Sequence, residues 1–309
     1  MRVTHRMLVR TALRDLQNGV QALGKYQEQL ASGKRLHRPS DDPFAVQRAI
    51  NMRGEIQALE ACRRSISLSQ DWVNATDVAL DKLTDVLIRA RNVALRGADD
   101  SIGSDARQAV AMEAAQLVGS ALQCANSSTQ GRYLFAGYKI DQPPFVGLDA
   151  ASEATTDPDA IIAVEYRGDD GAIVRELEPG VSLQINVNGT QPWLAPDDPA
   201  SVFALLLQLR DALAADDAGA VRGLLDRFEA AVQAVGGARA MIGAKSQRLA
   251  AALDKLEAVT LGLQDLLSQT EDVDMAEAVV HFAQREAVLK VALQVNARIL
   301  PTSLLDYLR

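Results

Sequence analysis

Apolar residues recur at alternating intervals of four and three over residues 9–30. This spacing is typical of the seam of a coiled-coil helix. The seam consists of Val9, Leu13, Leu16, Val20, Leu23 and Leu30, with Gln27 in the remaining position. A helix with such a stripe is marginal alone, because its apolar face needs a partner. The pattern therefore predicts that this segment pairs with another helix.

The last part of the chain repeats this pattern. Its stripe consists of Met275, Val279, Phe282, Leu289, Leu293 and Leu300, with Glu286 as the polar exception. Val280, Val288, Val295 and Ile299 widen the stripe. Because both ends carry an unmatched apolar face, we expect the N- and C-terminal helices to pair. Residues 1–42 and 268–309 would then form a terminal coiled-coil domain.

A longer helix is predicted from Pro43 to about residue 96, where every seventh position from 45 to 94 is apolar. At 1.5 Å per residue such a helix is about 80 Å long. A second helix is expected over about 105–129, with Ser104 as its N-cap.

Helical periodicity returns at residues 203–213. It returns again from about residue 220 as a very long pattern that persists almost to the C-terminus and is weakened at Gly236, Gly237 and Gly243. We expect residues 43–140 and 200–267 to form an α-helical rod domain.

Between these helical segments, apolar residues tend towards alternation with polar ones, which is the two-residue period of a β-strand. Residues 161–166, 172–177 and 181–187 are predicted strands, and Asn188-Gly189 has turn chemistry. Residues 141–199 would form a β-rich insertion domain. The predicted fold class is mainly α, an elongated rod of long coiled-coil helices with a small β-rich insertion at its tip.

Composition agrees with long helices, since 48% of residues are apolar but only 4% are aromatic. The formal net charge of −8 argues against nucleic-acid binding. Arg2, Arg6, Arg10 and Arg14 form one polar stripe. A solvated or interface face explains this stripe better than a phosphate-binding one.

No apolar run reaches the ~18 residues that a membrane-spanning helix needs, so no membrane insertion is expected. The opening residues are interrupted by charges and lack the apolar core of a cleaved secretory signal. We expect any export to follow a route without such a signal. Cys62 and Cys124 imply no disulfide framework.

The motifs of catalysis are missing from the sequence. The three histidines are dispersed, and no His-x-x-x-His or Cys-x-x-Cys pair suggests zinc. No phosphate-binding loop, dinucleotide glycine pattern or nucleophile elbow is present. The sequence therefore predicts no catalytic residue, no cofactor and no metal, and a protein that is not an enzyme.

The stretch GKRLHRPSDDP at residues 33–43 separates the first two predicted helices. Gly33 suits the residue after a helix, and Ser40 or Asp41 suits an N-cap before Pro43. We interpret the stretch as a joint. The charges of Arg35, Asp41 and Asp42 would serve as hydrogen-bonding groups within the joint or between subunits.

The terminal helices would leave much of their apolar surface exposed, which soluble monomers rarely do. We therefore predict that they meet copies of themselves or related subunits and become ordered on assembly. Head-to-tail contacts of this kind build rings or filaments. The predicted assembly residues are Leu13, Leu16, Val20, Leu23, Leu30, Arg35, Asp41, Asp42, Val279, Phe282, Leu289, Leu293 and Leu300.

An aromatic cluster follows the second rod helix in GRYLFAGYKIDQPPF, residues 131–145. Aromatic side chains at the exit from a helix commonly fill the junction between two domains. Direct contact with a partner is the alternative. The residues of this domain-junction motif are Tyr133, Leu134, Phe135, Gly137, Pro144 and Phe145.

Three segments resemble axial proteins of the bacterial flagellum, the flagellin family. QLASGKRLHRPSDDPFAVQRA (29–49) is similar to the segment after the first terminal helix of flagellins, and residues 237–257 resemble their returning rod helix. Residues 268–308 resemble their C-terminal helix. The motif at 131–145 is similar to the hook–filament junction branch of this family.

The resemblance implies a non-catalytic, extracellular adaptor, exported unfolded by the flagellar type III apparatus. Its implied partners are the first hook-associated protein, flagellin and copies of itself in a ring, with a cytoplasmic export chaperone on the C-terminal helix. Flagellin itself is the alternative. An enzyme that uses the β insertion and a secreted coiled-coil adhesin or translocator are further alternatives.

Overall fold

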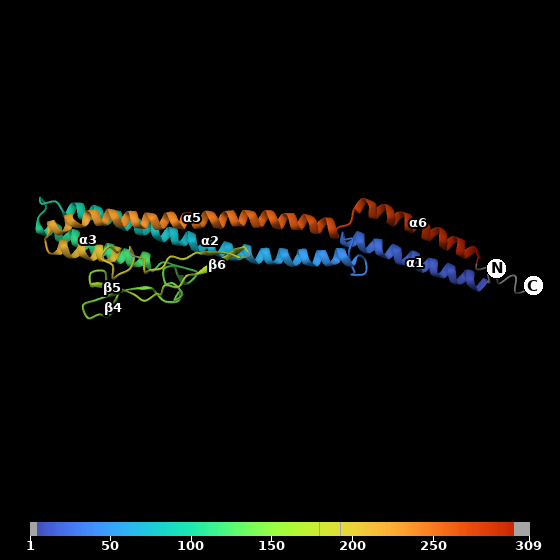
Figure 1. Cartoon of the computed structure of the whole chain (residues 1–309), viewed down its shortest axis with the longest axis horizontal. Helices are drawn as coiled ribbons and strands as arrows, with labels where there is room; N and C mark the ends of the chain where they lie inside the picture. The colour runs from blue at the N-terminus through green and yellow to red at the C-terminus, as the bar shows by residue number, and fades with distance from the viewer. Residues whose placement is uncertain (1–4, 179, 192, 300–309) are drawn as a thin grey trace, which may run out of the picture. The chain divides into compact units, whose positions relative to one another are not determined.

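The computed structural model describes residues 5–178, 180–191 and 193–299 of the 309-residue chain. Helices account for most of the described residues (Figure 1). The helices are α1 (His5–Ser32), α2 (Pro43–Gly97), α3 (Ser104–Ala125), α4 (Val202–Ala214), α5 (Ala218–Glu271) and α6 (Met275–Ile299). The mainly α-helical class with a small β-rich insertion is confirmed.

The chain forms two compact units. The first unit combines residues 1–59 with 258–309, and the second comprises residues 60–257. The long helices α2 and α5 each contribute residues to both units. The three domains expected from the sequence, with boundaries at 42/43, 140/141, 199/200 and 267/268, stay a prediction.

In the first unit α1 and α6 pack against each other and run antiparallel (Figure 1). The Leu289 side chain of α6 packs against Gly19 of α1, where an added Cβ would lie 3.3 Å from Leu289 Cδ1. A larger residue at position 19 would therefore require this leucine to shift by a few tenths of an ångström. The predicted pairing of the terminal helices is confirmed.

The second unit has a helical core in which α3 and α4 pack together beside α2 and α5 (Figure 1). The seven-residue repeat of α2 explains which face turns inward. Of its predicted positions in this unit, Ile66, Val73, Leu80, Leu87 and Ala94 are fully buried. In the part of α2 that belongs to the first unit, Ala45 is fully buried, and Met52 and Leu59 are half-buried. Phe203, Leu205, Leu206 and Leu209 of α4 are also buried.

The β-rich insertion contains small antiparallel sheets. Strands β4 (Ala154–Thr155), β3 (Phe145–Leu148) and β5 (Ala163–Tyr166) form one sheet in that order. The other two are the hairpins β1–β2 (Ser128–Thr129 and Arg132–Tyr133) and β6–β7 (Val174–Glu178 and Val181–Gln184). The strands predicted at 161–166, 172–177 and 181–187 contain β5, the start of β6 and β7.

The insertion lies against the flank of the helices of its unit, and not at a tip. The Cys62 thiol of α2 donates to the Leu177 carbonyl oxygen at 2.8 Å, and Lys255 Nζ of α5 lies 2.6 Å from Glu178 Oε2. The apolar side of the β6–β7 hairpin explains this position, since Leu177 and Leu183 are buried.

Three helix ends differ from the prediction. Ser104 is the first residue of α3, and Gly103 occupies the N-cap without a side-chain hydrogen bond. The same helix ends at Ala125, four residues before its predicted end. Asp105 in the first turn is placed favourably for the helix dipole. A break at residues 272–274 also separates α5 from α6, where the sequence predicted continuous helix.

The glycines expected to soften α5 do not interrupt it. Gly236 and Gly237 lie between Val235 and Ala238, which are 0% and 2% exposed. Packing of these apolar neighbours outweighs a propensity cost of about 1 kcal/mol per glycine.

Candidate assembly interface

The residues of the predicted α1 stripe point in two directions, some towards the interior and some towards solvent. Leu16, Leu23 and Leu30 are half-buried, whereas Leu13 and Val20 are 54% and 57% exposed. Three residues turn a helix by about 300°, so Leu13 and Val20 lie roughly 60° to one side of the inward seam. The pairing with α6 therefore covers only part of the stripe.

The stripe of α6 divides in the same way. Phe282 and Leu289 are half-buried, whereas Val279 and Leu293 are 52% and 51% exposed. The widening valines are exposed too, with Val288 62% accessible. Leu300 of the predicted set lies outside the described residues.

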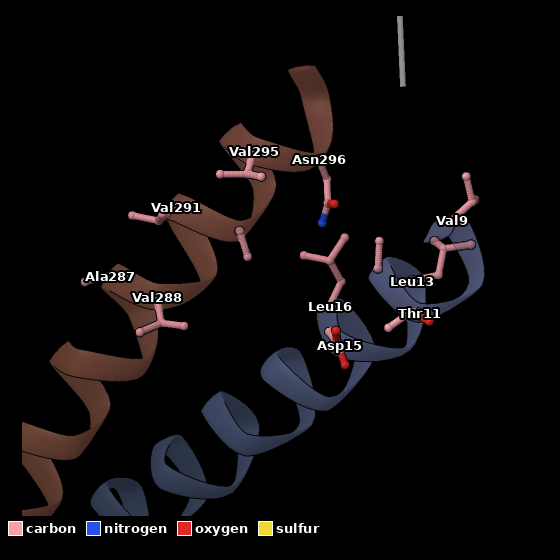
Figure 2. Close-up of a pocket in the computed structure, with 12 residues that line it drawn as sticks. Val9, Thr11, Leu13, Asp15, Leu16, Ala287, Val288, Val291, Val295 and Asn296 are labelled. Carbon is pink, nitrogen blue, oxygen red and sulfur yellow. The ribbon is translucent and has the colours of Figure 1, made fainter. Parts of the chain in front are cut away.

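Between α1 and α6 is a largely apolar groove of about 970 Å³. Its lining comprises Val9, Thr11, Ala12, Leu13, Asp15 and Leu16 of α1 and Ala287, Val288, Val291, Ala292, Val295 and Asn296 of α6. Figure 2 shows Leu16 and Asn296 pointing towards each other between the two helices. Among the described lining residues Asp15 is the only charged one, so the described part of the groove suits an apolar protein surface and offers no convergent catalytic groups.

The joint after α1 is held to the end of α5 by a buried carboxylate. Glu271 is 3% exposed, and its Oε2 lies 3.0 Å from Lys34 Nζ and 2.6 Å from Arg53 Nη2. Two cations compensate a carboxylate that would otherwise be costly to bury. This pairing ties together three segments of the first unit that are remote in sequence.

Backbone hydrogen bonds reinforce the joint. Arg35 N donates to Glu271 O at 2.6 Å, and Val273 N donates to Gly33 O at 3.0 Å. The Arg35 guanidinium donates to Thr270 O at 2.9 Å. Gly33 has a φ of 71°, in the left-handed region that suits glycine after a helix. The predicted assembly residue Arg35 thus has partners within the joint.

The carboxylates of the joint also have local partners. Asp41 Oδ1 lies 2.9 Å from Lys25 Nζ, and Oδ2 accepts from the backbone N–H groups of Arg38 and His37. The hydrogen bond from Lys25, followed by that from Arg38, lowers the pKa of Asp41 to about 2. Asp41 is therefore ionised at neutral pH and fixes the loop to α1.

Asp42 is the N-cap of α2. Its Oδ1 accepts from Ala45 N at 3.0 Å, and Pro43 is the first helical residue. Ser40 and Asp41 were the predicted caps, and both predictions are wrong. The helix begins later because proline at its first position leaves the preceding residue in the capping place.

Sequence reasoning missed two buried polar residues of the joint. Gln29 is 6% exposed and donates to Arg35 O at 3.1 Å, and Glu271 is the centre of the ion pairs. Gln29 points about 100° around the helix from its neighbour Leu30, so the stripe did not indicate its burial. The local sequence did not indicate that Glu271 would be buried in ion pairs, because its partners are more than 200 residues away.

The motif at 131–145 lies in the second unit and forms core. Leu134, Phe135 and Phe145 are at most 2% exposed, Pro144 is buried and Tyr133 is half-buried. The ring centroid of Phe145 is 5.1 Å from that of Tyr166 and 5.2 Å from that of Phe203 in α4. These contacts join the insertion to the helices.

The backbone around the motif is also fixed. Asn126, just after α3, accepts from Phe145 N at 3.0 Å and donates to Phe145 O at 2.7 Å. Gly137 has a φ of 69°, and a Cβ there would collide with Asp169. These contacts give the motif a role inside the subunit. Its role at a domain junction stays a prediction.

Among the described residues, no cluster of three or more His, Cys, Asp or Glu side chains could hold a metal ion. None of the described helices combines the length and apolar character that a membrane crossing requires.

Comparison with protein families gives two matches at the two ends of the chain. Residues 3–140 match the bacterial flagellin N-terminal helical region, and residues 225–308 match the bacterial flagellin C-terminal helical region. Together they cover more than half of the chain. The chain belongs to the bacterial flagellin family. The resemblance expected from the sequence is confirmed.

Among the similar members of the flagellin family, one is named a hook-associated protein and another a flagellin. Flagellar hook-associated protein 3 of Escherichia coli K12 is 25% identical over 224 residues, which are 70% of this chain and 66% of that protein. The match thus spans slightly less than two thirds of that relative. Flagellin of Bacillus subtilis 168 is 24% identical over 327 residues and is matched along the whole of both chains.

Solved structures show the same fold. A putative flagellar hook-associated protein from Vibrio parahaemolyticus superposes with a TM-score of 0.64 and 19% identity. The match covers 75% of this chain and 100% of that one. The fold described above is therefore shared with that solved structure.

Proposed function

We propose that the chain is a structural subunit of the bacterial flagellum that joins the hook to the flagellin filament. The observation that carries the proposal is the apolar surface left exposed on the α1–α6 pair, with its groove of about 970 Å³. The relatives supply the context, since one of them is named flagellar hook-associated protein 3. The family is structural, which supports a protein that is not an enzyme.

The exposed surface supports assembly energetically. Each Val or Leu side chain gains roughly 1.5–3 kcal/mol when it is moved from water into a fully buried place. The exposed apolar residues of the pair are Met7, Leu13, Val20, Met275, Val279, Val280, Val288, Val291, Leu293 and Val295. Burial of this set between subunits would offset the entropy lost on association.

The proposed neighbours are the first hook-associated protein on the hook side and flagellin on the filament side, with copies of this chain forming a ring between them. We propose that Leu13, Val20, Val279 and Leu293 face these neighbours. Arg35, Asp41 and Asp42 would keep the joint in the geometry that assembly needs. An export chaperone would cover the α6 surface before the chain leaves the cell by the flagellar type III apparatus.

Flagellin is the second candidate function, favoured by the full-length match to the Bacillus subtilis flagellin. The two functions differ in polymerisation. Purified flagellin should extend long filaments from seeds at high salt, whereas a junction subunit should add no more than a short segment.

Deletion of the gene tests the proposal. We expect cells with hooks but without filaments, and with flagellin released into the medium. Normal filaments in the deletion strain would contradict the junction function. Absence of the flagellin protein together with loss of filaments would instead support the flagellin function.

A further inference from the structure

The second unit contains a cleft that the proposed function does not use. It has a volume of about 490 Å³ and is lined by residues of α2, the β1–β2 hairpin and the segment leading into β6. Trp72, Ile173 and Ile185 give it an apolar lining, and Trp72 is 8% exposed. Leu68 and Tyr138, 60% and 66% exposed, also line the cleft.

The charged residues of the cleft are predominantly basic. Arg132 and Arg175 are both exposed and both line it, together with the carboxylate of Asp71. Tryptophan, tyrosine and arginine are the residues most enriched at the energetic centres of protein interfaces. The lining therefore fits an apolar side chain flanked by carboxylates.

A segment of this chain has that chemistry. The turn DPDAII at residues 157–162 carries the exposed carboxylates of Asp157 and Asp159, and Ile162 beside them is 54% exposed. Asp157 Oδ1 accepts from Asp159 N at 3.2 Å, and Asp157 O accepts from Ala160 N at 3.1 Å. These hydrogen bonds preorganise the turn, which reduces the entropy lost on binding.

The turn is fixed to a different part of the second unit. The guanidinium of Arg210 in α4 donates to Ile161 O, and Pro158 lies against Gly119 of α3. The cleft instead lies beside α2 and β6. The turn therefore packs on α3 and α4, whereas the cleft is formed on α2, the β1–β2 hairpin and β6.

We infer that the acidic turn 157–162 of one copy docks into the cleft of the next copy, with Ile162 between Leu68 and Tyr138 and the two aspartates facing Arg132 and Arg175. Two different patches on the same chain make a heterologous contact, which closes a ring or continues along a helix. This inference rests on the proposed function, because it requires copies of the chain to lie side by side.

Disulfide trapping in assembled flagella tests this contact. The variant Leu68→Cys/Ile162→Cys is expressed in place of the natural chain, and purified flagella are oxidised. We expect a ladder of dimers and larger species on a non-reducing gel. Each single variant, and the control Val78→Cys/Ile162→Cys, should stay monomeric. Val78 is an exposed α2 residue outside the cleft, 53% accessible.

A charge exchange gives a second readout. The variant Arg132→Glu/Arg175→Glu should reduce the trapped dimer at least tenfold in the double-cysteine background, and adding Asp157→Lys/Asp159→Lys should restore it. The control Arg64→Glu/Arg248→Glu makes the same change in net charge at exposed sites outside the cleft and should have no effect.

The outcomes separate this contact from the proposed function. If the double-cysteine chain is present in the flagellum but yields no ladder, the contact is wrong and the proposed function stands. If the ladder forms but reversing the two arginines leaves it unchanged, the charge pairing is wrong. If the natural chain is absent from purified flagella, both the proposed function and the contact are overturned.

Discussion

The two units of this protein use similar apolar repeats with opposite results. In the second unit Ile66, Val73 and Leu80 of the α2 repeat are 0% exposed. In the first unit Leu13 and Val279 of the terminal repeats are more than half exposed. A heptad repeat therefore predicts that a helix face will be buried. It does not predict whether the surface that buries this face belongs to the same chain. The predictions below test this difference.

Removal of a core ring from the second unit should have the largest effect. Phe145 is 1% exposed and contacts the rings of Tyr166 and Phe203. Phe145→Ala should lower the free energy of unfolding by roughly 3–5 kcal/mol, through lost burial and the cavity left behind. Chemical denaturation of the full chain, followed by tryptophan fluorescence, measures this change.

Leu13→Ala is the matched control in the first unit. Leu13 is 54% exposed, so its truncation should change the free energy of unfolding by about 0.5 kcal/mol or less. Equal losses for the two variants would show that the first unit is covered in the free chain.

A buried arginine closes the end of the helical core. Arg107 is 6% exposed, donates to the carbonyl oxygens of Gly97 and Asp99 at 3.1 Å each, and pairs with Asp216. Arg107→Ala should cost about 2–3 kcal/mol because the buried Gly97 carbonyl, the Asp99 carbonyl and the Asp216 carboxylate all lose their donor. Arg107→Lys keeps the charge but not the planar fork, so its stability should fall between those of the natural chain and the alanine variant. Full rescue by lysine would show that charge alone matters.

The joint of the first unit should be less sensitive. Glu271→Gln removes a buried charge whose partners Lys34 and Arg53 are about half exposed, so roughly 1–2 kcal/mol should be lost. Faster hydrogen exchange in the joint measures the loss. Glu257→Gln is the control, since Glu257 is 61% exposed and 3.9 Å from Arg63, and it should leave exchange in the joint unchanged.

The smallest expected effect is the loss of stability at low pH. The pKa of Asp41 falls from an ordinary 3.8 to about 2 in the folded joint. Because the folded state favours the ionised form, this contribution to stability is complete above pH 3.8 and is lost as the pH falls through about 2. Lys25→Met should raise the Asp41 pKa towards its ordinary value in an NMR titration. An unchanged pKa would assign the shift to the backbone donors alone.

The long helices could be predicted from sequence because their signals are local. The predicted helix 43–96 and the observed α2, Pro43–Gly97, differ by one residue at the end. Period-two patterns likewise located β5, β6 and β7. The strands β1, β2 and β4 were missed because two residues are too few to show a period, and β3 was missed because its sequence FVGL does not alternate between apolar and polar residues.

The break between α5 and α6 was missed because no glycine or proline marks it. Asp274 caps α6 by accepting from Ala276 N and Glu277 N at 2.9 and 3.2 Å. The spacing of Asp274 and Glu277 resembles a capping box and could have indicated the start.

The candidate interface was only partly predictable. The sequence predicted the stripes but not their division: Leu16 turns inward and Leu13 outward because the crossing of α1 and α6 selects one side of a wide stripe. That choice depends on packing between helices remote in sequence. The sequence likewise did not predict the hydrogen-bond partners of Arg35 and Asp42 within the joint.

Hydrogen exchange, measured in the free chain and in assembled flagella, tests the central claim most directly. The account predicts fast exchange in α1 and α6 of the free chain, slow exchange in α3 and α4, and strong protection of all four helices after assembly. Strong protection of α1 and α6 already present in the dilute free chain and unchanged on assembly would contradict it.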